Sequence, residues 1–195
     1  MVSRGLSGRG AGRLRGAGTL AKLGGQPTPG PPMFAVPSPS TAPLADFYRD
    51  LEGQCRGLLH GERDFTANSA NLAALLFNTL PDLNWAGFYW LKQGELVLGP
   101  FQGKPACVRI AMGRGVCGTA AERKASVVVE DVHAFPGHIA CDAASRSEVV
   151  VPVVKEGRLL GVLDLDSPTP ARFSEEDARG LERLVVAFCE LTDTP

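Results

Sequence analysis

Three of the five cysteines in the chain lie within 35 positions of one another, and each has turn-forming or acidic neighbours. Cys107 follows a proline by two positions, Cys117 lies among glycines, and Cys141 directly precedes an aspartate. Buried structural cysteines behave as small hydrophobic residues and belong inside apolar runs, whereas reactive cysteines occupy polar, partly exposed surroundings. We therefore interpret these three cysteines as a redox-active group.

The nucleophile of such a group is a thiolate, so the cysteine that loses its proton most easily is the candidate. Cys117 is expected in the first turn of a short helix, where the helix dipole favours an anion. Cys141 is expected in an irregular stretch over residues 131–147, and loops longer than about 12–15 residues in a compact domain usually carry function. The residue types leave both cysteines open, and an exposed loop cysteine without a role is the alternative for Cys141.

Carboxylates form the second candidate group. Asp164 and Asp166 alternate with leucines, so both project from one face of a predicted strand. Adjacent like charges repel, and one of them is therefore expected to be protonated or paired with a cation such as an ammonium group. Glu148 is a third candidate acid, and Trp85 and Tyr89 are candidates for an aromatic wall. The alternatives are the solvent face of an edge strand for the two aspartates and ordinary core packing for the aromatic pair.

Hydrophobic periodicity predicts the elements that position these residues. The pattern predicts helices over residues 44–60, 66–80, 116–124 and 174–191, and strands over 85–91, 95–98, 107–112, 126–130, 149–154 and 159–166. Cys55 and Cys189 lie on the apolar stripes of the first and last helices, which favours core packing for both. The order predicts the α+β class, with an antiparallel sheet of about six strands covered by helices.

Residues 1–43 differ from the rest, with nine glycines, seven prolines and few large apolar side chains. Such a composition cannot bury enough surface to offset the entropy of ordering, so we expect disorder. Arginines, serines and threonines without an acid are typical of an organellar transit peptide, although glycines disfavour the helix that such peptides form. A solvated tail without a targeting role is the alternative.

Charge and cysteine content exclude several classes of protein. Residues 1–45 carry a charge of +5 and the other 150 residues a charge of −6, and a mildly acidic body argues against a nucleic-acid partner. No apolar run approaches the roughly 20 residues that span a bilayer. Five cysteines without framework spacing do not indicate a secreted disulfide scaffold. We expect a soluble, cytoplasmic protein, or an organellar one if residues 1–43 are a transit peptide.

Six segments resemble the free methionine-R-sulfoxide reductases, a catalytic branch of the GAF domain fold. They are residues 84–89, 99–107, 108–110 with 113–118, 130–133, 137–145 and 161–167. The likeness covers about residues 44–192, in order and without large gaps, and includes all three candidate cysteines. It predicts a GAF-like catalytic domain over residues 44–195, whereas residues 1–43 have no counterpart.

The resemblance implies an activity and assigns roles to the candidate residues. The enzyme would reduce free L-methionine-(R)-sulfoxide through sulfenic acid and disulfide intermediates, with thioredoxin as reductant, no metal or organic cofactor, and a homodimeric state. It implies that Cys141 is the nucleophile, that Cys107 and Cys117 are resolving cysteines, that Glu148, Asp164 and Asp166 hold the sulfoxide and amino groups, and that Trp85 and Tyr89 surround the methyl end.

Two alternatives belong to other classes of protein. Many GAF domains are non-catalytic sensors of a small ligand, although a sensor does not need three cysteines in polar surroundings. A structural zinc site formed by His138 with Cys107, Cys117 and Cys141 would lack the close C-x-x-C pair of most such sites. We therefore favour the enzyme.

Overall fold

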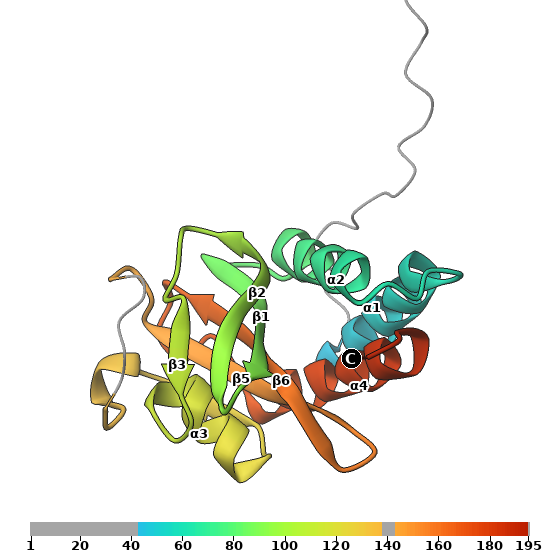
Figure 1. The fold of residues 1–195 in the computed structure, drawn as a ribbon. Helices are drawn as coiled ribbons and strands as arrows, with labels where there is room; N and C mark the ends of the chain where they lie inside the picture. Colours follow the sequence, from blue (N-terminus) through green and yellow to red (C-terminus); the bar gives the residue numbers. More distant parts are fainter. Residues whose placement is uncertain (1–42, 138–142, 195) are drawn as a thin grey trace, which may run out of the picture. The chain divides into compact units, whose positions relative to one another are not determined.

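The computed structural model describes residues 43–137 and 143–194, in which a six-stranded antiparallel sheet lies between two groups of helices (Figure 1). The strand order is β3-β2-β1-β6-β5-β4. The elements are α1 (Leu44–Leu59), α2 (Phe65–Thr79), β1 (Trp85–Lys92), β2 (Glu95–Gly103), β3 (Arg109–Ala111), α3 (Gly115–Arg123), β4 (Val127–Val129), the 3₁₀ helix η1 (Val132–Ala134), β5 (Ser147–Lys155), β6 (Arg158–Ser167) and α4 (Glu175–Leu191). The predicted α+β class is confirmed.

The sheet buries both of its faces, and each face meets a different group of helices. Helices α1, α2 and α4 gather on one side, and α3 lies on the other (Figure 1). On β6, Leu163 and Leu165 pack toward the first group, whereas Val162 packs on the α3 side. Because side chains alternate along a strand, Asp164 also faces α3.

A local sequence signal fixes the start of the last helix. Ser174 and Asp177 form a capping box at the start of α4, which begins where the hydrophobic pattern predicts. The Tyr48 hydroxyl donates a hydrogen bond of 2.8 Å to Asp177 and thereby joins α1 to α4.

Cys55 and Cys189 are buried among apolar side chains, which confirms that both are packing residues.

The described structure corrects two of the predicted strand starts. The third strand begins at Arg109 rather than at Cys107, which lies in the loop after β2 and shortly after Pro105, a residue without a backbone N–H. The fifth strand begins at Ser147 rather than at Val149, so Glu148 lies within a strand and pairs with β6.

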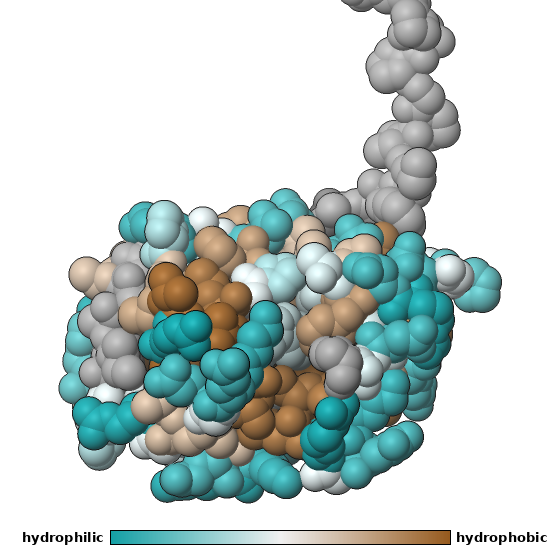
Figure 2. Space-filling model, viewed as in Figure 1, coloured by the Kyte–Doolittle hydropathy of each residue, from teal (hydrophilic) through white to brown (hydrophobic). Residues whose placement is uncertain are grey.

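The hydropathy of the surface differs between the helices and the strands. Over α1 and α4 it is mostly hydrophilic, whereas apolar surface lies mainly over the strands (Figure 2). Charged pairs such as Arg56 with Glu190 join the exposed sides of these two helices. Among the described residues, no helix is both long and apolar enough to cross a membrane.

Candidate active site

A pocket lies on the α3 side of the sheet and collects residues from five parts of the chain. Strands β1, β5 and β6 form its floor, and α3 and the loop after β2 form its walls. Its lining residues are Trp85, Tyr89, Lys104, Pro105, Ala106, Ile110, Arg114, Gly115, Val116, Cys117, Ser145, Glu148, Asp164 and Asp166. Six of the eight site residues predicted from the sequence therefore lie in one pocket.

Strand register places the carboxylates next to one another. Glu148 on β5 lies directly across from Asp166 on β6, which in turn lies across from Trp85 on β1. Asp164 lies on the same face of β6, two residues from Asp166. Like charges on neighbouring strands destabilise a sheet, so this arrangement favours a protonated carboxyl or a cationic ligand. The strand is central rather than at an edge, and Asp164 is buried, so the alternative that these aspartates form the solvent face of an edge strand is wrong.

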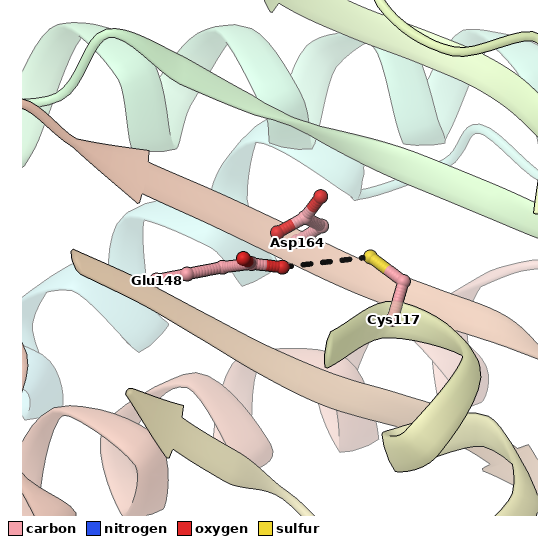
Figure 3. Close-up of side chains that lie close together, drawn as sticks. All are labelled: Cys117, Glu148 and Asp164. Atoms are coloured by element: carbon pink, nitrogen blue, oxygen red, sulfur yellow. Dashed lines mark hydrogen bonds between the residues drawn. The ribbon is translucent and has the colours of Figure 1, made fainter. Parts of the chain in front are cut away.

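Cys117 faces the same carboxylates from the opposite wall. It lies in the first turn of α3, as predicted, and its thiol donates a hydrogen bond of 3.8 Å from Sγ to Oε1 of Glu148. Figure 3 shows the side chains of Cys117, Glu148 and Asp164 pointing toward one another from α3, β5 and β6. All three are buried, with 4%, 6% and 6% of their surface exposed.

These surroundings decide the protonation state of Cys117. Burial raises the pKa of its thiol well above the usual range, and the charges of Asp164 and Glu148 raise the pKa further. The helix dipole would lower the pKa, but its effect is typically below about 1 kcal/mol. The helix dipole therefore does not favour a thiolate at Cys117 in these surroundings. The thiol is protonated near neutral pH.

The carboxyl groups are shifted in the same direction. Burial raises the pKa of Glu148 well above its usual range, and the charges of Asp164 and Asp166 add to this. Burial also raises the pKa of Asp164 to about 7, against opposing hydrogen bonds with Cys117 and Glu148. A carboxyl group with such a pKa can hold a proton at neutral pH and donate it to an oxygen atom of a bound molecule.

An aromatic wall stands beside the acids. The ring of Trp85 stacks on Phe101 at 5.4 Å and on Tyr89 at 5.8 Å between centroids, and its indole N–H donates to the carbonyl of Lys104. Gly87 lies between the two β1 aromatic residues, and the Trp85 ring lies so close that a Cβ at Gly87 would approach it to 2.6 Å. The wall therefore offers a fixed apolar surface to a ligand.

Neither of the other two candidate cysteines is among the described lining residues of the pocket. Cys107 is partly exposed and follows the pocket residue Ala106, but it is not a lining residue itself. Cys141 lies outside the described residues, as does His138. The described residues resume at Ala143. Ser145 lines the pocket, and its hydroxyl accepts a hydrogen bond of 3.0 Å from the Asn84 side chain.

Three polar lining residues were missed by the sequence reasoning. Lys104 lies in the loop after β2, Arg114 is the N-cap of α3, and Ser145 precedes β5. Arg114 lies between two glycines just before a predicted helix, and this position was the only feature of the sequence that could have indicated a pocket residue. Loop residues have no period, so their direction could not be inferred from the pattern.

Comparison with known proteins identifies the family. Residues 66–187 match the GAF domain. The free methionine-R-sulfoxide reductase of Escherichia coli (strain K12) is 56% identical over 140 residues, which cover 72% of this chain and 85% of that protein. The chain belongs to the free methionine-R-sulfoxide reductases. Family members are oxidoreductases, so membership makes this chain an enzyme of that class.

Solved structures of other free methionine-R-sulfoxide reductases share the fold. The X-ray structure of the Neisseria meningitidis enzyme in complex with its substrate is 45% identical, with a TM-score of 0.74, and the match covers 78% of this chain and 92% of that chain. The Staphylococcus aureus fRMsr in complex with substrate is 48% identical, with a TM-score of 0.71 and coverage of 74% and 94%.

Proposed function

We propose that the enzyme reduces free L-methionine-(R)-sulfoxide to L-methionine in the α3-side pocket. The observation that carries this proposal is the meeting of three acids, an aromatic wall and a cysteine in that pocket. Relatives at 56% and 44% identity carry the name free methionine-R-sulfoxide reductase. A free amino-acid sulfoxide is a small molecule with ionic groups and an apolar methyl end. The acids of the pocket suit the ionic groups, and the aromatic wall suits the methyl end.

The acids have two tasks in this proposal. Ionised carboxylates, with Asp166 among them, bind the substrate ammonium, and a protonated carboxyl of Glu148 or Asp164 donates to the sulfoxide oxygen. Charge-assisted hydrogen bonds of this kind are stronger than neutral ones. Trp85 and Tyr89 surround the methyl end, where they exclude water and add apolar contact.

The chemistry balances with two thiols and one external reductant. The Cys141 thiolate attacks the sulfoxide sulfur, and the oxygen accepts a proton from the carboxyl group. The sulfoxide S–O bond then breaks and its oxygen passes to the Cys141 sulfur as a hydroxyl group. Methionine leaves reduced by two electrons, and Cys141, oxidised by the same two electrons, becomes a sulfenic acid. A second thiol then attacks the sulfenic sulfur, which forms a disulfide and releases water. A reduced dithiol such as thioredoxin restores both thiols by exchange.

Cys117 suits the second step better than the first. Its high pKa disfavours attack on the substrate, and its hydrogen bond to Glu148 offers an acceptor for its proton when it attacks the sulfenic acid. Cys107 is the other proposed resolving thiol, and its partial exposure suits exchange with an external reductant. Ser145, four positions after Cys141, lines the pocket, and this supports the assignment of the nucleophile.

Three further proposals rest on the sequence and on the family resemblance. We propose that residues 1–43 are an extension outside the catalytic domain, that the protein is a homodimer, and that it works in a reducing compartment such as the cytoplasm. Sedimentation of the purified protein tests the second of these.

The direct test is turnover of the free sulfoxide epimers with a thioredoxin system. We expect reduction of the R epimer and little reduction of the S epimer or of peptide-bound methionine sulfoxide. Binding of the sulfoxide without any methionine product would contradict the proposal and favour the sensor. Matched turnover of both epimers would remove the stereochemical part of the proposal.

A further inference from the structure

The group formed by Cys117, Glu148 and Asp164 has the composition of a metal site. One thiol sulfur and two carboxylate oxygens lie within 4.8 Å of one another, and all three side chains are buried. This donor set differs from the cysteine-histidine site weighed from the sequence. It comes from three separate elements, so it could not be found from ligand spacing along the chain.

A second observation points to a cationic ligand at this position. Oδ1 of Asp164 is buried and has no hydrogen-bond partner among the described residues. An unsatisfied buried polar atom costs about 1–3 kcal/mol. A cation bound between Asp164 and its two neighbours would satisfy this oxygen and would also neutralise the crowded negative charge.

We propose that Zn²⁺ binds to the reduced enzyme at Cys117, Glu148 and Asp164 and blocks the pocket. A thiolate with two carboxylates suits Zn²⁺ better than Mg²⁺ or Ca²⁺, which prefer oxygen ligands alone. Three protein ligands leave the fourth tetrahedral position open toward the pocket.

The three donor atoms, which lie within 4.8 Å of one another, must move closer together to hold a zinc ion. In a tetrahedral zinc site with ligand bonds of about 2.0–2.3 Å, the ligand atoms lie roughly 3.3–3.7 Å apart. Cys117 and Glu148 already approach this spacing at 3.8 Å. The bound metal would deprotonate the thiol and release its proton to solvent.

Two consequences follow for the enzyme. The metal would hold both carboxyl groups that are proposed to donate to the sulfoxide oxygen, and it would lie next to the proposed ammonium site at Asp166, so zinc and sulfoxide would compete. It would also hold Cys117 as a coordinated thiolate, which could no longer resolve a sulfenic acid. Binding itself is independent of the proposed function, and only the inhibition of turnover rests on that function.

The test titrates Zn²⁺ into the reduced full chain carrying Cys107→Ser and Cys141→Ser, which removes the other two thiols of the redox group. Calorimetry is expected to show one Zn²⁺ per chain, and Co²⁺ is expected to give a thiolate-to-cobalt charge-transfer band. Absence of binding in this background would overturn the proposal. Circular dichroism checks that each variant is folded.

Single substitutions in that background identify the ligands. Loss of a second-shell partner typically costs 10–100-fold in affinity, so Cys117→Ser should cost at least about 100-fold and remove the cobalt band. Glu148→Gln and Asp164→Asn should weaken binding, and Asp166→Asn, the matched control, should weaken it less than Asp164→Asn. Unchanged affinity of Cys117→Ser, or an equal loss in Asp166→Asn, would overturn the three-ligand assignment.

Turnover of the wild-type enzyme separates this proposal from the proposed function. We expect Zn²⁺ to inhibit reduction of the sulfoxide competitively and Mg²⁺ to have no effect. Zinc binding that depends on Cys117 but leaves turnover unchanged would contradict the placement of the substrate in this pocket, while the metal site would stand.

Discussion

At the scale of residues, the site depends on three acids that cannot all be ionised together. Glu148 and Asp166 lie across from each other, and Asp164 shares their face of the sheet. Burial and mutual repulsion keep protons on this group at neutral pH. The same group can therefore supply a negative charge for an ammonium and a proton for an oxygen, without any additional residue.

The ammonium contact predicts a specific loss in Asp166→Asn. Removing one charge-assisted hydrogen bond costs about 1.5–3 kcal/mol, which is roughly 10- to 150-fold in binding. We expect kcat/KM for the free sulfoxide to fall by this factor with the fold intact. Asp50→Asn, at an exposed position on α1, is the control and should leave kcat/KM unchanged. Equal activity of the wild type on N-acetylated substrate would show that no ammonium is bound.

The raised pKa of Asp164 predicts a pH-dependent contribution to stability. The folded protein holds the Asp164 proton from the ordinary pKa of 3.8 up to about 7. The contribution of Asp164 is therefore fully present below pH 4 and is lost as the pH rises through 7. The free energy of unfolding of the wild type, relative to Asp164→Asn, should fall by about 1.4 kcal/mol per pH unit in this window. Denaturant unfolding at several pH values measures this difference, and a flat or rising difference would contradict the assignment.

At the scale of elements, a glycine in β1 allows the rings of the aromatic wall to pack close to the strand. Gly87 lies across from Asp164 and between Trp85 and Tyr89, so the Trp85 ring can lie close to the strand. A Cβ at this position would meet the Trp85 ring at 2.6 Å and the Phe101 Cα at 2.9 Å. Neither the central strand nor its neighbour can move away easily.

Gly87→Ala should therefore damage both the fold and the site. Overpacking of this kind typically costs about 1–3 kcal/mol of unfolding free energy, and displacement of the Trp85 ring should raise KM. Gly53→Ala is the matched control, because its Cβ would meet nothing within 4 Å on the helix α1. It should stabilise the protein by about 0.5–1 kcal/mol. A Gly87→Ala variant with wild-type stability and KM would show that the close contact is unimportant.

The elements also show how far the sequence could predict the site. Alternation with leucines correctly placed Asp164 and Asp166 on one face, and the apolar stripes correctly placed Cys55 and Cys189 in the core. The contact of Cys117 with Glu148 could not be predicted, because it depends on how α3 packs against the sheet. The raised pKa of the Cys117 thiol could not be predicted for the same reason, since it comes from burial and from the neighbouring carboxylates.

At the scale of the whole molecule, the candidate site uses residues only from the GAF domain. Every lining residue falls between Trp85 and Asp166, within the matched residues 66–187. Nothing in the proposed chemistry requires residues 1–43, whose composition disfavours a contribution to the core. The extension and the catalytic domain are therefore expected to be separable.

A chain that begins at Pro43 should retain wild-type kcat and KM for the free sulfoxide. Its free energy of unfolding should also match that of the full chain, because the composition of residues 1–43 disfavours a contribution to the core. Steady-state turnover and denaturant unfolding of the two chains measure this, and a collapse in activity with an intact fold would contradict it. A reporter fused to residues 1–43 tests the targeting role, and a purely cytosolic signal would exclude an organellar address.

The assignment of Cys141 as nucleophile is the central claim, and a single cycle without reductant tests it most directly. The wild type should release methionine from the R-sulfoxide, and Cys141→Ser should release none, because a hydroxyl near neutral pH provides almost no anion. Cys107→Ser and Cys117→Ser should each still release about one equivalent, since attack precedes resolution. Cys55→Ser and Cys189→Ser should lower only stability. One equivalent of methionine from Cys141→Ser, or none from Cys107→Ser, would contradict the assignment and return the nucleophilic role to another thiol.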